Sequence, residues 1–326
     1  ITGGESTSGQ TGQGAGIYSD HSNPIIQNVS LQYNSATRGG GIYLNFSDAK
    51  IINVLLTNNQ GYSIGAGIYM RYSNPVIYNT SISYNITASG FGGGIYIYAS
   101  DPIIANSDII GNKATGGAGI TVDLFSQPIL SNLIISSNET TLDYVTNQYN
   151  ECLYASPAQG CLQGGGILFL RDPQSIENNN INLTNITITE NRADEGSGIF
   201  IGWGAHTLNI INTIVWDNST ESIHYENWQG GDDTYFPIIM YSNIEGNSIW
   251  DGTGNINTDP LLNSDFTLGV NSPCINSGNP NLWYSGIIYH PECILDTTSV
   301  ANMFIENCCN TSINHGIPIA RAKVKD

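Results

Sequence analysis

Residues 92–112 read GGGIYIYASDPIIANSDIIGN and contain every part of a unit that recurs along the chain. The unit opens with glycines, an isoleucine and a large residue, and it closes with two asparagines six positions apart. A recurring unit of this length is the signature of a solenoid, in which each repeat forms one coil. The glycine–isoleucine pair recurs at intervals of 25, 26, 27, 25, 47 and 32 residues, at Gly16-Ile17, Gly41-Ile42, Gly67-Ile68, Gly94-Ile95, Gly119-Ile120, Gly166-Ile167 and Gly198-Ile199.

Asparagine recurs in phase with this pair. The first asparagines of the units are Asn28, Asn53, Asn79, Asn106, Asn132, Asn185 and Asn212, and their partners six residues later are Asn34, Asn59, Asn85, Asn112, Asn138, Asn191 and Asn218. Asparagine tolerates the backbone angles of sharp turns, and stacked amides can hydrogen-bond from coil to coil. We therefore expect the first set to form a structural ladder that satisfies buried backbone groups at a turn.

Three apolar positions recur in each unit. They are the isoleucine of the glycine pair, a residue two positions before the first asparagine, and a residue three positions after it. One unit is too short to bury these side chains alone, but coils stacked at about 4.8 Å would align them in continuous columns. The pattern predicts an all-β parallel β-helix, or solenoid, with three short strands per coil, about nine to ten coils and an irregular C-terminal segment. Pro24, Pro75, Pro102 and Pro128 mark the corner between the first and second strands.

The composition excludes several classes of function. Of 326 residues only 11% are charged, and the formal net charge is −18. Such a chain is repelled by nucleic acid and by anionic membranes, so we expect no nucleic-acid partner. It also lacks an apolar run of the roughly 18 residues that a membrane-spanning helix needs, and Ile1 does not begin a signal peptide.

The six cysteines are even in number and lack the paired spacing of a zinc site. Cys152 and Cys161 flank a short loop and predict a disulfide, which would indicate an oxidising compartment. Free thiols remain the alternative. The pairing of the other four stays open: Cys274, Cys293, Cys308 and Cys309.

The GGGIY…S-N-P-I-I-x-N pattern resembles the right-handed parallel β-helix repeats of the pectin-lyase-like superfamily, over about residues 10–225. The stretches YSNIE (241–245), GNINTDPL (254–261), DFTL (265–268) and SPCINSG (272–278) are similar to the closing coils of bacterial surface β-helix proteins. We therefore expect regular coils over 1–225 with an insertion at about 140–163, and closing coils over 226–280. The tail over 281–326 shares no such resemblance, and we interpret it as a C-terminal cap or arm.

The residue after each glycine–isoleucine pair is expected to point outward, because side chains alternate along a strand. This places Tyr18, Tyr43, Tyr69 and Tyr96 in an aromatic strip, continued by Thr121, Leu168 and Phe200. An exposed strip of this kind suits a sugar or protein partner. The alternative is that stacked tyrosines only stabilise neighbouring coils.

Two residues further along the same face lie Asp20, Asn45, Arg71, Tyr98 and Asp123. Polysaccharide lyases of the superfamily carry calcium ligands and a basic catalyst there, and such chemistry needs clustered acids beside an Arg or Lys. Here the acids are separated by whole coils, and Asp20 and Asp123 are about 19 Å apart, so one calcium ion cannot bind both. We expect Arg71 to be solvated or stacked on tyrosine.

Asp232 and Asp233 are the remaining catalytic candidates beside Arg71 and Asp123. The hydrolases of the superfamily combine adjacent aspartates with a Gly-His-Gly segment, which this chain lacks. We interpret the GGDD stretch as a loop, with weak calcium binding as the alternative. No resident cofactor or metal is expected.

The regular outer face favours a non-enzymatic extracellular structural or adhesive protein, secreted or held at the cell surface. Ile1 starts close to the repeat without an evident cap, and open strand edges template further pairing. Head-to-tail self-assembly into a fibre is therefore a hypothesis. The alternatives are a polysaccharide lyase or glycoside hydrolase acting on acidic polysaccharide, and a carbohydrate-binding module that uses the tyrosines.

Overall fold

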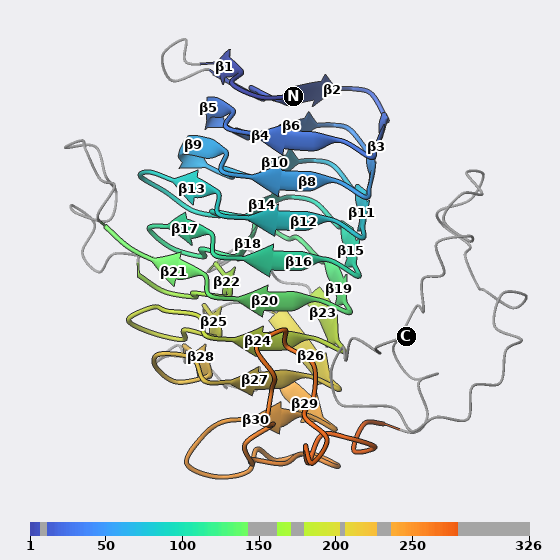
Figure 1. Ribbon diagram of the computed structural model, residues 1–326, viewed down its shortest axis with the longest axis vertical. Coiled ribbons are helices and arrows are strands. Elements are labelled where there is room, and N and C mark those ends of the chain that lie inside the picture. Colours follow the sequence, from blue (N-terminus) through green and yellow to red (C-terminus); the bar gives the residue numbers. More distant parts are fainter. Residues whose placement is uncertain (7–11, 143–161, 171–178, 203–205, 227–235, 280–326) are drawn as a thin grey trace, which may run out of the picture.

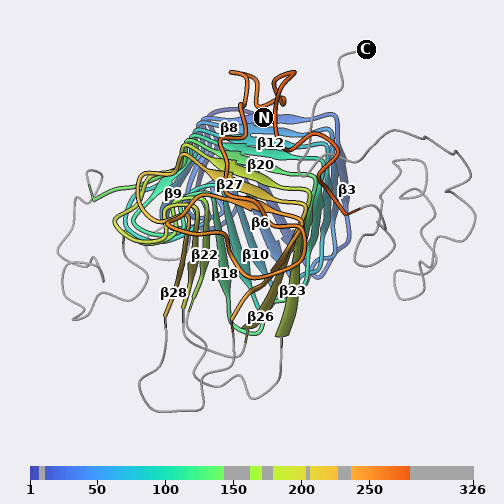
Figure 2. The same ribbon diagram turned by 90° about the horizontal axis from the view of Figure 1, so that it is seen from below.

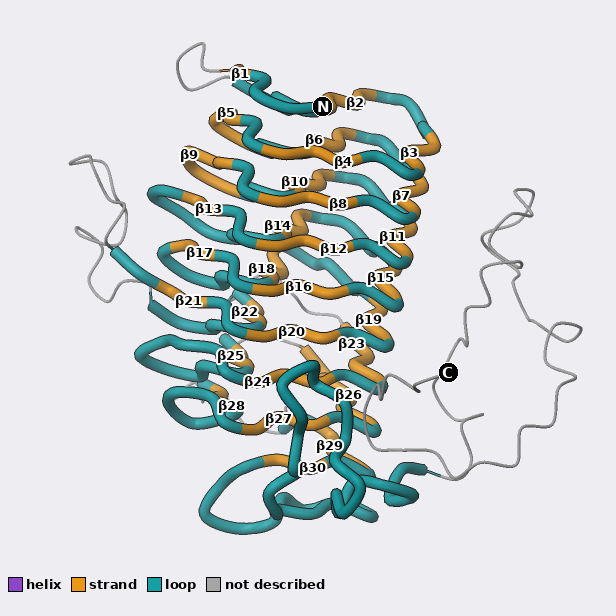
Figure 3. The backbone as a smooth tube through the Cα atoms, viewed as in Figure 1, coloured by secondary structure: helices purple, strands orange, loops and turns teal. Residues whose placement is uncertain are grey.

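The computed structural model describes residues 1–6, 12–142, 162–170, 179–202, 206–226 and 236–279. These residues form short parallel strands and turns, without a helix. The coils stack one above the next into a parallel β-helix (Figures 1 and 3). The all-β solenoid predicted from the repeat is confirmed.

Three sheets of eight strands run along the stack. The first sheet contains β2 (Ile17–Asp20), β6 (Ile42–Asn45), β10 (Ile68–Arg71), β14 (Ile95–Tyr98), β18 (Ile120–Asp123), β22 (Ile167–Phe169), β25 (Ile199–Ile201) and β28 (Ile223–Tyr225). The second contains β3 (Ile25–Gln27), β7 (Lys50–Ile52), β11 (Val76–Tyr78), β15 (Ile103–Ala105), β19 (Ile129–Ser131), β23 (Asn179–Thr184), β26 (His206–Ile211) and β29 (Ile238–Met240). The third contains β4 (Ser30–Gln32), β8 (Leu55–Thr57), β12 (Ser81–Ser83), β16 (Asp108–Ile110), β20 (Ile134–Ser136), β24 (Thr187–Thr189), β27 (Ile214–Trp216) and β30 (Asn243–Ile244).

A fourth, six-stranded sheet was not anticipated from the sequence. Its strands are β1 (Glu5–Ser6), before the first coil, and then β5 (Ser35–Arg38), β9 (Gln60–Ile64), β13 (Ile86–Thr87), β17 (Lys113–Ala114) and β21 (Glu139–Thr140), which follow the third strands β4, β8, β12, β16 and β20. Seen along the stack, the four sheets surround the interior of the coils (Figure 2). These strands are two to five residues long, and no large apolar residue recurs at a fixed position in them, unlike in the other three sheets.

The strand register follows the repeat. Ile68 pairs with Ile42 on one side and with Ile95 on the other. The 47-residue interval also adds only one coil, because Ile120 pairs directly with Ile167. The repeat spacing therefore measures coils even where the chain between two strands is longer.

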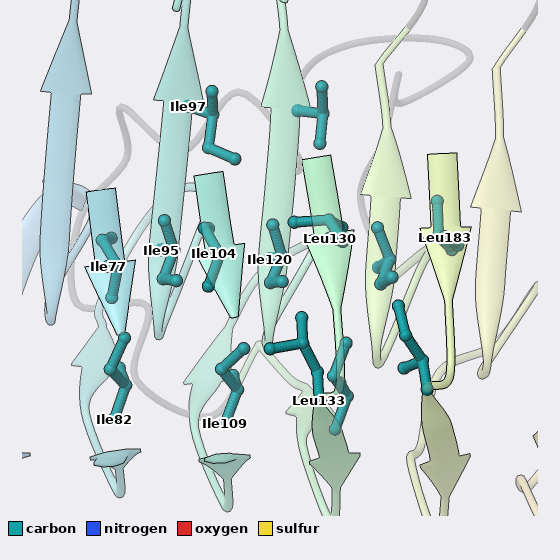
Figure 4. Close-up of a cluster of buried hydrophobic side chains, with 14 of the residues drawn as sticks. Ile77, Ile82, Ile95, Ile97, Ile104, Ile109, Ile120, Leu130, Leu133 and Leu183 are labelled. Atoms are coloured by element: carbon teal, nitrogen blue, oxygen red, sulfur yellow. The ribbon is translucent and has the colours of Figure 1, made fainter. Parts of the chain in front are cut away.

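The interior of the stack is filled by the three predicted apolar columns. Their members are buried in the described coils, except for the half-buried Ile17 of the first coil. A fourth column adds Leu44, Met70, Ile97, Val122 and Phe169 from the first sheet. Figure 4 shows how residues from neighbouring coils, such as Ile77, Ile104 and Leu130, lie beside one another along the stack. Burial of one such side chain contributes roughly 1.5–3 kcal/mol, so the columns are the main source of stability.

The second set of asparagines forms a ladder that is buried except at its last, half-buried member Asn218. We call it the inner ladder: Asn34, Asn59, Asn85, Asn112, Asn138, Asn191 and Asn218. Oδ1 of Asn85 accepts the backbone N–H of Asn59 at 2.9 Å and its side-chain N–H at 3.0 Å. Nδ2 of Asn85 in turn donates to the Leu56 carbonyl at 3.1 Å and to Oδ1 of Asn112 at 3.0 Å. Buried donors and acceptors at this turn are thereby satisfied.

The first set forms a second column, the outer ladder, at the corner between the second and third sheets. All seven residues have positive φ: Asn28, Asn53, Asn79, Asn106, Asn132, Asn185 and Asn212. Asn79 donates to Asn53 at 2.7 Å, and Asn53 donates to Asn28 at 3.2 Å, but these three side chains are exposed. The predicted hydrogen-bonded ladder is confirmed for these three residues and for the pair Asn106 and Asn132. The buried backbone groups expected for the first set are served by the inner ladder.

Glycine is required where the chain enters the first sheet. A Cβ atom on Gly41 would lie 2.6 Å from the Gly67 carbonyl oxygen and 2.6 Å from Leu56 Cδ2. The glycine before each isoleucine therefore lets one coil approach the next without a side chain between them.

The stack closes with loops. Its eight-stranded sheets make it shorter than the nine to ten coils expected, because residues 245–279 pair only through isolated bridges, at Asn243–Ile256 and Leu262–Leu268. This segment folds back over the outer face of the third sheet (Figures 1 and 2). There Cys274 packs with Ile214 and Leu268, and the Asn279 backbone N–H donates to Asn212.

Cys274 is a free, buried thiol whose sulfur accepts a hydrogen bond from Asn243 at 3.1 Å. The other cysteines lie outside the described residues, and so does the predicted disulfide of Cys152 and Cys161. The proposed C-terminal cap or arm over 281–326 also lies outside them.

Candidate ligand face on the first sheet

The predicted tyrosine strip stacks as expected but is not an open face. Ring centroids lie 5.4 Å apart for Tyr18 and Tyr43, 5.0 Å for Tyr43 and Tyr69, and 5.6 Å for Tyr69 and Tyr96. Only Tyr18 is exposed, at 49%, whereas Tyr43, Tyr69 and Tyr96 are 2%, 4% and 6% exposed. The expected exposure of this strip is therefore wrong for the last three residues, and its role as a face for a ligand or partner stays a prediction.

The tyrosines are covered by the connections that lead from the fourth sheet into the first. Ile64, the last residue of β9, and Phe91, on the connection from β13 to β14, pack against the tyrosine cluster. Gly65 and Gly92 have positive φ, and a Cβ on either would lie 2.7 or 2.8 Å from the Cβ of Tyr69 or Tyr96. Strand alternation places the tyrosines outside the interior of the coil, but this second layer removes them from solvent. The same holds for Thr121, Leu168 and Phe200.

The next outward column keeps its predicted order. Asp20, Asn45, Arg71, Tyr98 and Asp123 are direct strand neighbours in the first sheet. Nδ2 of Asn45 donates to Asp20 at 2.6 Å, and this hydrogen bond lowers the pKa of Asp20. Asp20 is thus a carboxylate at neutral pH, and its side chain stays 40% exposed.

Arg71 lies in the middle of this column against aromatic rings. Its guanidinium carbon is 4.9 Å from the ring centre of Tyr72 and 5.9 Å from that of Tyr98. A hydrogen bond with Tyr72 raises the pKa of Arg71 further. The expectation that Arg71 stacks on tyrosine is confirmed, and these contacts fix a positive charge on a surface that carries few.

Asp123 hydrogen-bonds to a tyrosine hydroxyl and not to a basic side chain. The Tyr96 hydroxyl donates to Oδ2 of Asp123 at 2.6 Å, and Oδ1 accepts the Leu124 backbone N–H at 2.8 Å. Burial, and next the Asp123 charge, raise the pKa of Tyr96 well above its ordinary value. Arg71 and Asp123 share one column with Tyr98 between them, about 10 Å apart at two strand spacings. They are not brought together as a catalytic pair.

A second aromatic column, which we call the corner column, was missed from the sequence. It consists of His21, Phe46 and Tyr72, which directly follow strands β2, β6 and β10 and all have positive φ. Their ring centroids are 4.9 Å apart in both pairs, with interplanar angles of 21° and 23°. Phe46 and Tyr72 are 48% and 37% exposed. Because the ring faces pack on one another, mainly ring edges are left for a partner.

The remaining chemistry-bearing candidates do not form a site within the described residues. Asp232 and Asp233 lie outside those residues. In the described part of the chain, no three His, Cys, Asp or Glu side chains are placed to share a metal ion. None of the described residues forms a helix of the length and apolar character that crossing a bilayer requires.

The end of the stack carries a groove of about 700 Å³. Residues 218–223 of the last coil form one wall, and the loop 245–251 forms the other. Its lining combines the carboxylates of Glu221, Glu245 and Asp251 with the indole of Trp250. The loop therefore lies against the end of the stack beside β28.

Comparison with known proteins agrees with the geometry of the coils. Residues 13–167 match the family described as right handed beta helix region. Over these residues the chain is similar to right-handed β-helix repeat proteins, and its coils form a parallel β-solenoid. No match to this β-helix was found among the curated proteins or the solved structures. The match covers β2 to the first residue of β22, and therefore includes the candidate face on the first sheet.

Proposed function

We propose that this β-helix is a non-enzymatic extracellular structural or adhesive protein that binds partners along the outer faces of its sheets. The observation that supports this most is the use of its outward polar groups. Asn45, Asp20, Asp123 and the N-terminal part of the outer ladder hydrogen-bond to the same or the next coil. Such groups stabilise a rigid rod and leave aromatic edges and a few charges exposed for binding.

The alternative of a lyase or hydrolase needs a base and an acid that reach one substrate bond. In the described residues, Arg71 is stacked between two rings and Asp123 bonds Tyr96 and the Leu124 backbone. A carbohydrate-binding role needs open ring faces, whereas the rings of the corner column cover one another. Both alternatives therefore receive less support than a scaffold.

Head-to-tail fibre formation remains a prediction. Beyond β28 the loop 245–251 lies across one end of the stack, and another molecule could pair there only after this loop moved. Lateral contacts through the outer faces need no such movement, so we favour them as the route to adhesion.

Two measurements test the proposal. The first is incubation with a panel of uronate polymers, with and without calcium, followed by assays for unsaturated ends and reducing sugars; we expect none, and turnover would overturn the proposal. The second is retention of protein-coated beads on surfaces that carry the same protein or extracellular polymers. We expect retention, and beads that wash off every surface like albumin-coated beads would contradict an adhesive role.

A further inference from the structure

The exposed strip on the first sheet carries its charges in a self-complementary order. Asp20, Asn45 and Arg71 occupy the same strand position in three successive coils, so an acid and a base flank a neutral amide at equal spacing. The corner column repeats this symmetry, with His21 and Tyr72 on either side of Phe46. A surface that is its own complement about a central element is what a twofold dimer requires.

We propose that a second copy of this chain docks on this strip, with a twofold axis along β6 that sets Asp20 of each copy against Arg71 of the other. This inference deepens the proposed function, on which it rests, by naming the partner. The axis reverses the stacking direction of the second copy and preserves the position along the strand. It therefore also sets Phe46 against Phe46, and His21 against Tyr72.

The charge balance of the strip favours this occupant. A molecule with a net charge of −18 repels other acidic surfaces, including its own copy, unless local charges compensate. Arg71 is a cation held in place by Tyr72 and Tyr98. Asp20 is a carboxylate whose side chain is 40% exposed. Two such contacts related by symmetry, with aromatic edges between them, supply attraction where the net charge supplies none.

A competing register would place the axis along β14, with Arg71 against Asp123. Both carboxylate oxygens of Asp123 already accept hydrogen bonds, from Tyr96 and from the Leu124 backbone. Both bonds to Asp20 from Asn45 and His21 reach a single oxygen, Oδ1. In addition, the corner residue beside Asp123 is aliphatic, Leu124, whereas His21 beside Asp20 supplies a ring for Tyr72. The register along β6 is therefore preferred.

Charge reversal tests the contact. By sedimentation equilibrium at tens of micromolar, we expect the full chain to be dimeric. We expect Arg71→Glu and Asp20→Arg to weaken the dimer by about tenfold or more, because each variant faces two like-charge contacts. Mixing these two variants restores both attractive contacts in a heterodimer, and the double variant Asp20→Arg/Arg71→Glu restores them in a homodimer.

Three outcomes would overturn the contact. They are a wild-type protein that stays monomeric up to about 100 μM, charge-reversal variants that dimerise as strongly as the wild type, and a mixture of the two variants that stays monomeric. Asp194→Arg, an exposed acid outside the strip, is the matched control and should leave the dimer intact. Thermal unfolding of each variant separates lost binding from lost folding. If monomeric Arg71→Glu still holds beads to extracellular polymers, or a monomeric wild type does so, the adhesive function stands and only the dimer fails.

Discussion

Two columns of asparagine run along the same stack, six residues apart in each coil, and they use one side chain for different purposes. In the inner ladder the amide is buried and satisfies backbone groups of the adjacent coil. In the outer ladder the residue is chosen for its backbone, because asparagine adopts positive φ at small cost, and its side chain reaches solvent in the first three coils. The same residue type thus recurs for two reasons: the inner position needs the hydrogen bonds of the amide, and the outer position needs a residue that adopts positive φ at the turn.

The largest effect should come from breaking the inner ladder. Asn85→Ala removes the acceptor for two N–H groups of Asn59 and the donor to Leu56, which leaves buried polar groups unpaired. We expect a loss of about 3–5 kcal/mol in the free energy of unfolding, measured by urea denaturation.

The matched variant in the outer ladder separates the two purposes. Asn79→Ala should cost about 1 kcal/mol, because alanine disfavours positive φ, whereas Asn79→Gly should restore most of the loss. Glycine at position 85 should destabilise at least as much as alanine. If glycine restored stability at both position 79 and position 85, the two ladders would not differ in what they require of asparagine.

The two aromatic columns allow the same comparison on the first sheet. Tyr69→Ala empties a site beneath Ile64 and Phe91, and we expect it to cost about 3 kcal/mol. Tyr72→Ala, three residues away and 37% exposed, should cost about 1 kcal/mol or less in the same denaturation assay. Equal losses would mean that Tyr69 is not covered as described.

The buried tyrosines also predict sensitivity to alkaline pH. Burial raises the pKa of Tyr69 and of Tyr96 in the fold, whereas tyrosine in the unfolded chain ionises near pH 10. Their contribution is therefore complete below about pH 10 and is lost as the pH rises further, by about 1 kcal/mol per tyrosine between pH 10 and 11. Tyr69→Phe should reduce this slope in urea titrations at the two pH values. A slope that Tyr69→Phe leaves unchanged would contradict this assignment.

The smallest effect on stability is expected for Phe46, an exposed residue of the corner column. Phe46→Ser should change the free energy of unfolding by no more than about 0.5–1 kcal/mol, since Phe46 is 48% exposed. The same variant should weaken self-association, because Phe46 lies on the proposed axis. A large loss of stability with unchanged association would argue against a binding role for the corner column.

The repeat predicted most of the fold because the residues of each column recur in the sequence at a nearly constant spacing. The isoleucine positions, the strand register and the single coil between Ile120 and Ile167 all follow from spacing. The fourth sheet could not be predicted in this way, because strands such as β13 and β17 are two residues long and share no large apolar residue at a matching position. Their pairing depends on the neighbouring coils, not on an apolar side chain.

The candidate site was predicted less well, and the reason is physical. Alternation along a strand distinguishes the interior from the exterior, but it cannot tell whether an exterior side chain is covered. The glycines at positions 65 and 92 were the available signal, since they let a connection lie within van der Waals distance of Tyr69 and Tyr96. The corner column had a signal too: each of His21, Phe46 and Tyr72 precedes a serine near the next corner.

The inner ladder has a consequence for how this protein can be altered. Asn138 and Asn191 are 53 residues apart in sequence, yet they make the same two hydrogen bonds as asparagines 25 to 27 residues apart. The ladder thus constrains where the chain returns and not how far it travels in between. Foreign sequence could be grafted between two ladder positions with the coils undisturbed, so the β-helix can serve as a display frame in which the number of coils and the displayed cargo are chosen independently.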